Sequence, residues 1–167
     1  EKFIQAHIRK AICSTFVLLK NKGNMLPLKE AESKKVATFA IGTSSKTKFQ
    51  YGVDRYVPAT HRLISTLPSS AGWDQQLASF QKFDMVIVAL YPEAADRKGK
   101  FSNDVVSFLN SLSKRTITVV VNFGNSVSLS GLDSLNGLLW AHDANPESED
   151  LASQFVFGSV PVQGKLP

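Results

Sequence analysis

The chain has 167 residues, 43% of them hydrophobic and 20% charged, which is typical of one globular domain with a real core. This composition excludes a disordered chain, the single cysteine excludes an internal disulfide framework, and no apolar run approaches the roughly 18 residues of a membrane span. The net charge of +5 is concentrated in residues 1–67. The lysines there are scattered without interleaved aromatics, which predicts a solvated or partner-facing surface and no nucleic-acid binding.

Apolar spacing and turn residues divide the chain into helices and strands. Residues 3–20 carry apolar side chains at three- and four-residue intervals, which predicts a helix that ends before Gly23 and Pro27. The remaining elements, in chain order, are predicted as a strand over 36–42, a short helix over 46–57, a strand over 60–66, a helix over 73–83, a strand over 84–90, a helix over 103–113, strands over 116–122 and 135–141, and a helix over 147–157.

Fully apolar strands that alternate with helices predict an α/β fold, a three-layer sandwich in which helices cover both faces of a mainly parallel sheet of about five or six strands. We expect residues 1–167 to form a single domain. Because the chain starts at Glu1 inside a helical pattern and stops at Pro167 without a tail, we also expect it to be part of a longer protein. A ligand of such a sheet would bind at the carboxyl ends of the strands.

Several motifs that would announce an enzyme are missing. The segment from Gly42 to Thr47 follows a strand, but Ser45 occupies the place of the second glycine that a phosphate-binding loop requires. The sequence has no Gly-x-Ser-x-Gly motif for a serine hydrolase. His7 and His61 have no Cys or carboxylate at metal-ligand spacing. We therefore expect neither a metal nor another cofactor.

Two positions at predicted strand ends are candidates for binding. His142 follows a strand together with Asp143, where a polar contact to a ligand or partner is plausible. Glu93, Asp96 and Arg97 lie in the loop after the most apolar strand, and two neighbouring carboxylates are the minimum requirement for glycoside hydrolysis. A polar surface loop of this composition is also common, so this pattern alone leaves both readings open.

Three stretches resemble a known family. Ser14 to Asn21, ending Leu-Leu-Lys-Asn and followed by Leu26-Pro27-Leu28, is similar to the signature that opens the carboxyl-terminal domain of family 3 glycoside hydrolases. Residues 36–42 stand where that domain has its first parallel strand, and Phe157-Gly158 with Gly164-Lys165-Leu166-Pro167 resembles its closing motif. Residues 84–90 and 119–125 match two further family strands, although Ser126 replaces the family's proline.

The resemblance implies a retaining glycosidase of β-linked sugars in which the nucleophile lies on a preceding (β/α)8 barrel absent from this chain. The domain would pack beside that barrel, with carbohydrate at the boundary, and a further carboxyl-terminal domain follows in some bacterial relatives. The parent would be secreted or periplasmic by family habit. In β-glucosidases of this family the domain supplies an acid/base glutamate, whereas in the β-N-acetylglucosaminidase branch a His–Asp pair on the barrel does so.

The loop with Glu93 and Asp96 is short, lacks a glycine before Asp96 and lacks neighbouring aromatics, which favours the β-N-acetylglucosaminidase branch. We therefore assign no catalytic residue and expect a non-catalytic accessory domain, with Glu93, Asp96, Arg97 and His142 as candidate substrate contacts. The alternatives are a stand-alone carbohydrate- or nucleotide-binding module and an active glycosidase that uses Glu93 and Asp96.

Overall fold

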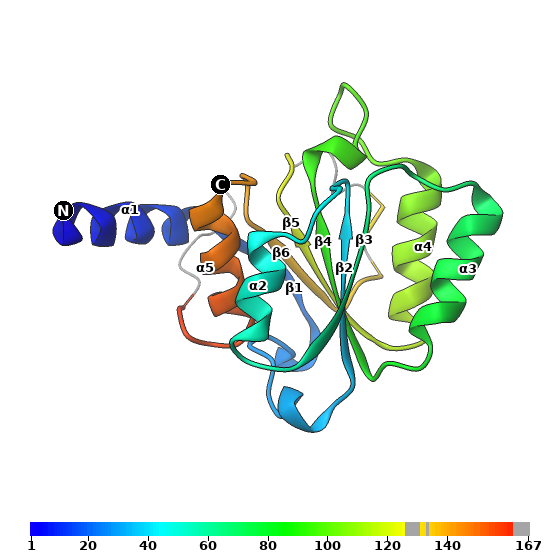
Figure 1. Cartoon of the computed structure of the whole chain (residues 1–167), viewed down its shortest axis with the longest axis horizontal. Helices are drawn as coiled ribbons and strands as arrows, with labels where there is room; N and C mark the ends of the chain where they lie inside the picture. The colour runs from blue at the N-terminus through cyan, green and yellow to red at the C-terminus, as the bar shows by residue number, and fades with distance from the viewer. Residues whose placement is uncertain (126–130, 133, 162–167) are drawn as a thin grey trace.

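A twisted sheet forms the middle layer of the computed structural model, which describes residues 1–125, 131–132 and 134–161 (Figure 1). Within these residues the sheet has six strands: β1 (Val17–Asn21), β2 (Val36–Ile41), β3 (Ala59–Ile64), β4 (Met85–Leu90), β5 (Ile117–Asn122) and β6 (Gly137–Trp140). The α-helices are α1 (Lys2–Thr15), α2 (Lys48–Asp54), α3 (Ser70–Phe80), α4 (Asn103–Ser113) and α5 (Pro146–Val156). Short 3₁₀ turns, η1 (Lys22–Asn24), η2 (Ala31–Ser33) and η3 (Pro92–Ala94), lie in the connections.

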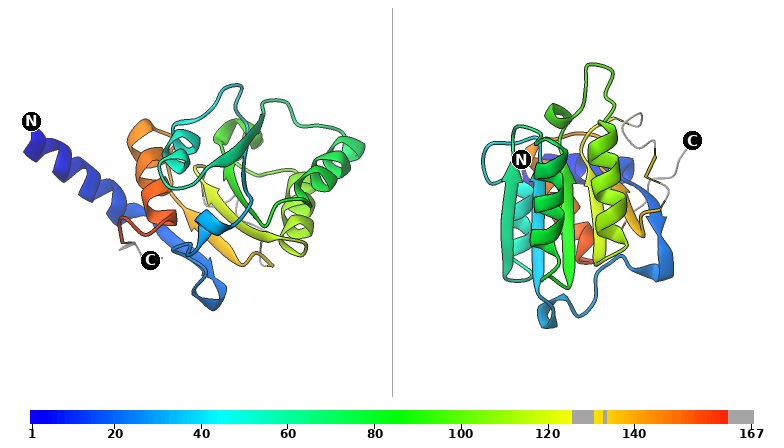
Figure 2. Two further views of the ribbon diagram at one scale, coloured as in Figure 1. Left: turned by 60° about the horizontal axis from the view of Figure 1, so that its bottom comes forward. Right: turned by 90° about the vertical axis from the view of Figure 1, so that its right-hand side faces the viewer.

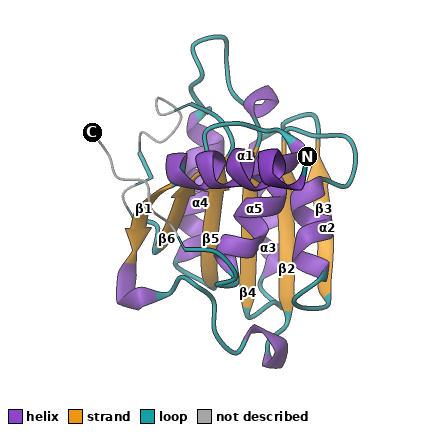
Figure 3. Ribbon diagram, turned by 90° about the vertical axis from the view of Figure 1, so that its left-hand side faces the viewer, coloured by secondary structure: helices purple, strands orange, loops and turns teal. Residues whose placement is uncertain are grey.

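The strand order is β1-β6-β5-β4-β2-β3, and every neighbouring pair is parallel except β1 with β6. Helices α3 and α4 cover one face, whereas α2 and α5 cover the other (Figures 2 and 3). The expected three-layer α/β sandwich with a mainly parallel sheet is therefore confirmed. The order of the parallel strands reverses between β2 and β4, which makes the carboxyl ends of these two strands the switch point where doubly wound folds bind ligands.

Both faces of the sheet are buried, which explains why its central strands are apolar without alternation. All six residues of β2 and all six of β4 are buried. Alternate side chains enter two separate cores, so that Phe39 packs with Phe80 and Phe108 on the α3/α4 side, while Phe49 and Phe123 meet on the α2/α5 side.

The predicted helix over 3–20 is wrong at its carboxyl end. Helix α1 stops at Thr15, and the next residues form the edge strand β1, antiparallel to β6 with Val17 opposite Trp140. Pairing with β6 gives the backbone of this segment partners in the sheet, and Phe16 and Val17 become buried. The helical spacing of the segment carries no information about a partner strand that comes so much later in the chain.

Candidate functional site

The loops that follow the parallel strands meet at one edge of the sheet, where the loop after β4 projects at the top of Figure 1. We call this region the strand-end edge; its described segments are residues 42–47, 91–103, 123–125 and 141–145. Three cavities of about 310, 360 and 490 Å³ open along it. These volumes reach the size at which small ligands bind to protein pockets, about 300–1,000 Å³.

The cavity of about 360 Å³ brings together three of the four candidate site residues. Asp96 and Arg97 line it from the loop after β4, and His142 lines it from the segment after β6. Phe123 and Asn125 contribute from the segment after β5. The structure thus places these side chains, which lie far apart in the sequence, around one space, and we refer to it as the His142 cavity.

His142 has an unusual backbone and an unusual side chain. Its φ of 66° lies in the left-handed region, which costs a non-glycine residue roughly 1–3 kcal/mol. The imidazole stacks on Trp140 with ring centroids 3.7 Å apart, and the Trp140 Nε1–H donates to the carbonyl of Gly124. Within the described residues the buried Nε2 of His142 has no hydrogen-bond partner. Because this atom is covered, a ligand contact through Nε2 requires rotation of the ring.

Asp96 organises its own loop. Its Oδ1 accepts hydrogen bonds from the backbone N–H groups of Lys98 and Lys100, at 2.8 and 2.9 Å, and its backbone N–H donates to the carbonyl of Lys100. The hydrogen bonds from the Lys100 and Lys98 backbone lower the pKa of this exposed carboxyl below its usual range. An acid/base catalyst that must donate a proton near neutral pH needs a raised pKa, so the geometry fits a loop-forming aspartate.

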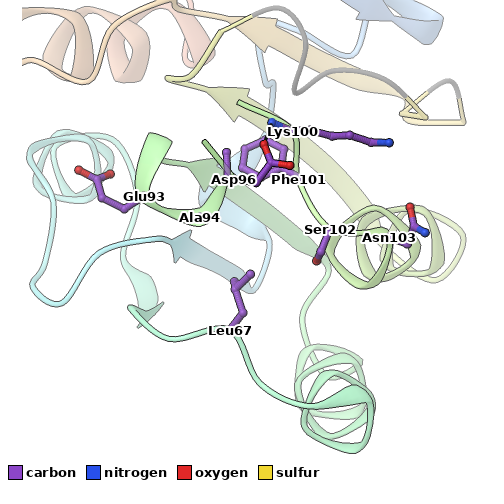
Figure 4. Close-up of a pocket in the computed structure, with 9 residues that line it drawn as sticks. Leu67, Glu93, Ala94, Asp96, Lys100, Phe101, Ser102 and Asn103 are labelled. Atoms are coloured by element: carbon purple, nitrogen blue, oxygen red, sulfur yellow. Dashed lines mark hydrogen bonds between the residues drawn. The ribbon is translucent and has the colours of Figure 1, made fainter. Parts of the chain in front are cut away.

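Glu93 lies on the other side of the loop and does not line the His142 cavity. It is exposed on η3 and lines the cavities of about 490 and 310 Å³. Figure 4 shows the largest of the three, where Glu93 and Asp96 are both present but their carboxyl groups point in different directions. The pair is therefore not arranged to act on one bond.

The cavity of about 310 Å³ lies at the switch point between β2 and β4, and we call it the switch-point cavity. A buried pair that the sequence patterns did not single out lines it: the Tyr91 hydroxyl donates to Glu149 Oε1 over 2.7 Å. Burial is the main reason that the pKa of Tyr91 is raised well above its usual value, and the acceptor Glu149 adds to the effect. Lys46 and Lys48 line the same cavity from the loop and helix after β2.

The segment after β2, residues 42–47, leads into the cap of a helix and does not form a phosphate-binding loop. Thr47 is the N-cap of α2 and exchanges hydrogen bonds with Gln50 in a capping box. Gly42 itself allows close packing, because a Cβ atom at this position would lie 2.8 Å from the backbone nitrogen of Ala94. The loop after β2 therefore packs closely against the loop after β4.

His61 belongs to a hydrogen-bonded chain away from the strand-end edge. Its Nδ1 lies 2.7 Å from Thr38 Oγ1 and its Nε2 lies 2.6 Å from Asp54 Oδ1, while Lys46 Nζ pairs with the second oxygen of Asp54. The hydroxyl, imidazole and carboxylate follow the order of a catalytic triad. Thr38, however, is 1% exposed, so no substrate can reach its hydroxyl, and the chain serves to tie α2 to β3.

None of the helices in the described part of the chain has the length and hydrophobicity that a membrane crossing requires. The same residues contain no group of three or more His, Cys, Asp or Glu side chains that could hold a metal ion.

The family comparison matches residues 16–167 to the model described as the glycosyl hydrolase family 3 C-terminal domain. The chain belongs to this family. The match extends from the first residue after α1 through every strand of the sheet, so it covers the whole strand-end edge. A comparison with curated proteins finds no significant match to the sequence.

Solved structures share the fold of this family 3 domain at low sequence identity. A family 3 β-N-acetylglucosaminidase from Paenibacillus sp. str. FPU-7 superposes with a TM-score of 0.77 at 16% identity, over 96% of this chain and 31% of the enzyme. A fungal multi-domain family 3 β-N-acetylglucosaminidase gives 0.71 at 16%, over 98% and 19%. A β-glucosidase from Listeria innocua gives 0.68 at 20%, over 95% and 26%. The chain thus spans less than a third of each of these proteins.

The structure gives a physical reason for one part of the family 3 signature. The side chain of Asn21 makes two hydrogen bonds to the backbone of Leu26: its Nδ2 donates to the Leu26 carbonyl, and its Oδ1 accepts from the Leu26 N–H. The Leu26–Pro27 peptide bond is cis. The end of the closing motif, residues 164–167, and the substituted position Ser126 lie outside the described residues.

Proposed function

We propose that this chain is a non-catalytic accessory domain of a family 3 retaining glycosidase that removes β-linked sugars, and that it packs beside a (β/α)8 barrel carrying the nucleophile. The observation that carries the proposal is the family match over residues 16–167, taken with the small share of each multi-domain relative that the chain spans. In this proposal the active site belongs to the barrel, and the strand-end edge forms one wall of its sugar cleft.

The carboxylates of the strand-end edge support a non-catalytic role. Most retaining glycosidases use two carboxyl groups about 5–5.5 Å apart, one as nucleophile and one as acid/base with a raised pKa. Glu93 and Asp96 point in different directions, and Asp96 is held ionised by its loop. Glu149 accepts the Tyr91 hydroxyl and is 9% exposed. Glu93 and Asp96 therefore lack a partner carboxyl group, Asp96 also lacks the raised pKa of a proton donor, and Glu149 is too buried to reach a substrate.

We further propose that the substrate is a β-N-acetylglucosaminide. The loop between β4 and α4 is drawn tight by Asp96, and its one glutamate, Glu93, does not line the His142 cavity and has no partner carboxyl group aligned with it. A parent of this type takes its proton donor from a His–Asp pair on the barrel, so the domain needs to supply none. In this arrangement the His142 cavity, with Asp96 and Arg97 in its wall, contacts sugar hydroxyls at the domain boundary.

The test compares the 167-residue chain with the full-length polypeptide that carries it, identified by its mass in extracts of the source cells. We expect the full-length protein to hydrolyse an aryl β-N-acetylglucosaminide faster than the matching β-glucoside and β-xyloside, and the chain alone to hydrolyse none of them. Turnover by the chain alone that is lost in Glu93→Gln would overturn the non-catalytic role. Binding of amino sugars or nucleotides to the chain alone, with a native mass near 18.3 kDa, would favour a stand-alone binding module.

His142 gives a finer test within the full-length enzyme. We expect His142→Ala to raise the KM of the aryl glycoside with a smaller effect on kcat, because the proposed contact orients sugar without touching the reacting bond. Lys82→Ala, at the opposite end of the strands, is the matched control and should leave both constants unchanged. Unchanged kinetics in His142→Ala would remove the His142 cavity from the proposed cleft.

A further inference from the structure

Helix α1 projects from the body of the domain and buries none of its residues (Figures 1 and 2). Three of its large apolar side chains are exposed: Phe3 is 71%, Ile4 59% and Ile8 41% exposed. A surface helix of a globular domain normally turns its apolar stripe toward the core. This helix leaves its stripe open to solvent.

The contacts of α1 with the domain come from its carboxyl-terminal half. Arg9 Nη1 lies 2.9 Å from Glu147 and 3.3 Å from Asp150, both in the first turns of α5. Ile12 and Cys13 pack against the α2/α5 core. At 3.6 residues per turn, Ile4 and Ile8 lie roughly opposite Cys13 and continue the stripe of Ile12 into the half of the helix that projects. The domain therefore fixes the orientation of α1 at one end and leaves this apolar face exposed at the other.

We propose that this exposed face, made by Ile4 and Ile8, is the surface on which the catalytic domain of the same polypeptide docks. The inference rests on the proposed function, because it takes its occupant from there. Two observations favour that occupant. The family match begins at residue 16, so α1 lies at the border of the domain. The alignment with the fungal enzyme covers 98% of this chain, which must include most of α1, yet only 19% of that enzyme.

Domain interfaces within one chain bury roughly 600–1,500 Å² and combine apolar and polar contacts. The apolar face of α1 would form the centre of such an interface. The ion pairs of Arg9 would keep the helix in the direction in which it projects, so that docking loses little further conformational freedom.

Hydrogen exchange measured by mass spectrometry tests the proposal on peptides that cover residues 2–15. We expect the amides of α1 to exchange at least about tenfold more slowly in the full-length polypeptide than in the 167-residue chain. Ile4→Glu with Ile8→Glu should abolish this difference. Ala6→Glu, which adds one negative charge to an exposed residue roughly opposite Ile4 and Ile8, should preserve it. Because all three positions are exposed, the variants should keep the unfolding temperature of the 167-residue chain.

Equal exchange of α1 in the two proteins would overturn the proposal. So would protection in the isolated chain that increases with its concentration, because that result assigns the face to a second copy of the chain. The glycosidase assay separates this inference from the proposed function. An active full-length enzyme with an unprotected α1 refutes the docking surface alone, whereas a protected α1 in a protein inactive on every glycoside refutes the function alone.

Discussion

Replacement of Gly42 by alanine tests how tightly the wall of the switch-point cavity is packed. Gly42 has a φ of 98°, and a Cβ atom there would lie 2.8 Å from the backbone nitrogen and 3.0 Å from the Cβ of Ala94. Ala94 belongs to η3, where its N–H donates to the carbonyl of Tyr91. These are backbone or rigid neighbours, so they cannot swing aside as the end of a long side chain could.

Two separate penalties add in Gly42→Ala. The left-handed backbone costs a non-glycine residue about 1–2 kcal/mol, and forced overpacking costs a further 1–3 kcal/mol or so. The free energy of unfolding should therefore fall by about 2–5 kcal/mol, and because a domain of this size loses about 2–4 °C of Tm per kcal/mol, Tm should fall by about 4–20 °C. Gly23 provides the matched control: its φ is 64°, but nothing lies within 4 Å of an added Cβ, so Gly23→Ala should carry the backbone penalty alone.

Thermal and urea unfolding followed by circular dichroism would measure both variants, and the m-value would show whether both unfold in the same two-state manner. We expect Gly42→Ala to lower the free energy of unfolding by at least about 1 kcal/mol more than Gly23→Ala does. Equal losses would refute it, since they would mean that η3 yields freely to the added methyl group. The switch-point cavity would then not be held in shape by this contact.

Three further substitutions are expected to follow from contacts in the structure. Gly52→Ala should destabilise the domain by about 1–2 kcal/mol although alanine favours helices, because the new Cβ would lie 2.7 Å from that of Ser153; Ser153→Gly in the same chain should reverse the loss in an unfolding titration. Tyr91→Phe should lower the free energy of unfolding by about 1–3 kcal/mol, because it leaves Glu149 without its donor. Since folding raises the pKa of Tyr91, the difference in denaturant midpoint between wild type and variant should be largest below pH 10 and shrink as the pH rises. For Asp54, partial burial acts to raise the pKa, but hydrogen bonds from Lys46 and His61 leave it lowered, so Asp54→Asn should cost less than about 1 kcal/mol at neutral pH and nothing once the pH falls well below 3.8.

The fold could be predicted from the sequence because its main signal is local. Buried parallel strands must be apolar on both faces, and the segments around Phe39 and Val88 carry that pattern directly. The strand β1 could not be predicted in this way. Leu18 and Leu19 sit in a helical spacing, and only the later residues of β6 provide the hydrogen-bond partners that make this segment a strand.

The candidate site was predicted in part, and for the same reason. Parallel strands bring their carboxyl ends to one edge, so the position of His142 and of the loop with Asp96 could be placed there from the strand assignments alone. The separation of Glu93 from that cavity depends on how η3 turns. The hydrogen bond between Tyr91 and Glu149 connects the end of β4 to the first turn of α5. Neither residue belongs to a sequence motif, so the pair could not be predicted.

The strand-end carboxylates explain why a domain with ligand-sized cavities would contribute binding and not chemistry. Asp96 gives Oδ1 to two backbone amides of its own loop, and Glu149 accepts the hydroxyl of Tyr91. Each group therefore holds a loop or a helix end in place, and the backbone hydrogen bonds that lower the pKa of Asp96 make it unsuited to donate a proton near neutral pH. An edge of this kind can shape one side of a sugar cleft with little reorganisation, and the reacting groups must then come from the domain that faces it.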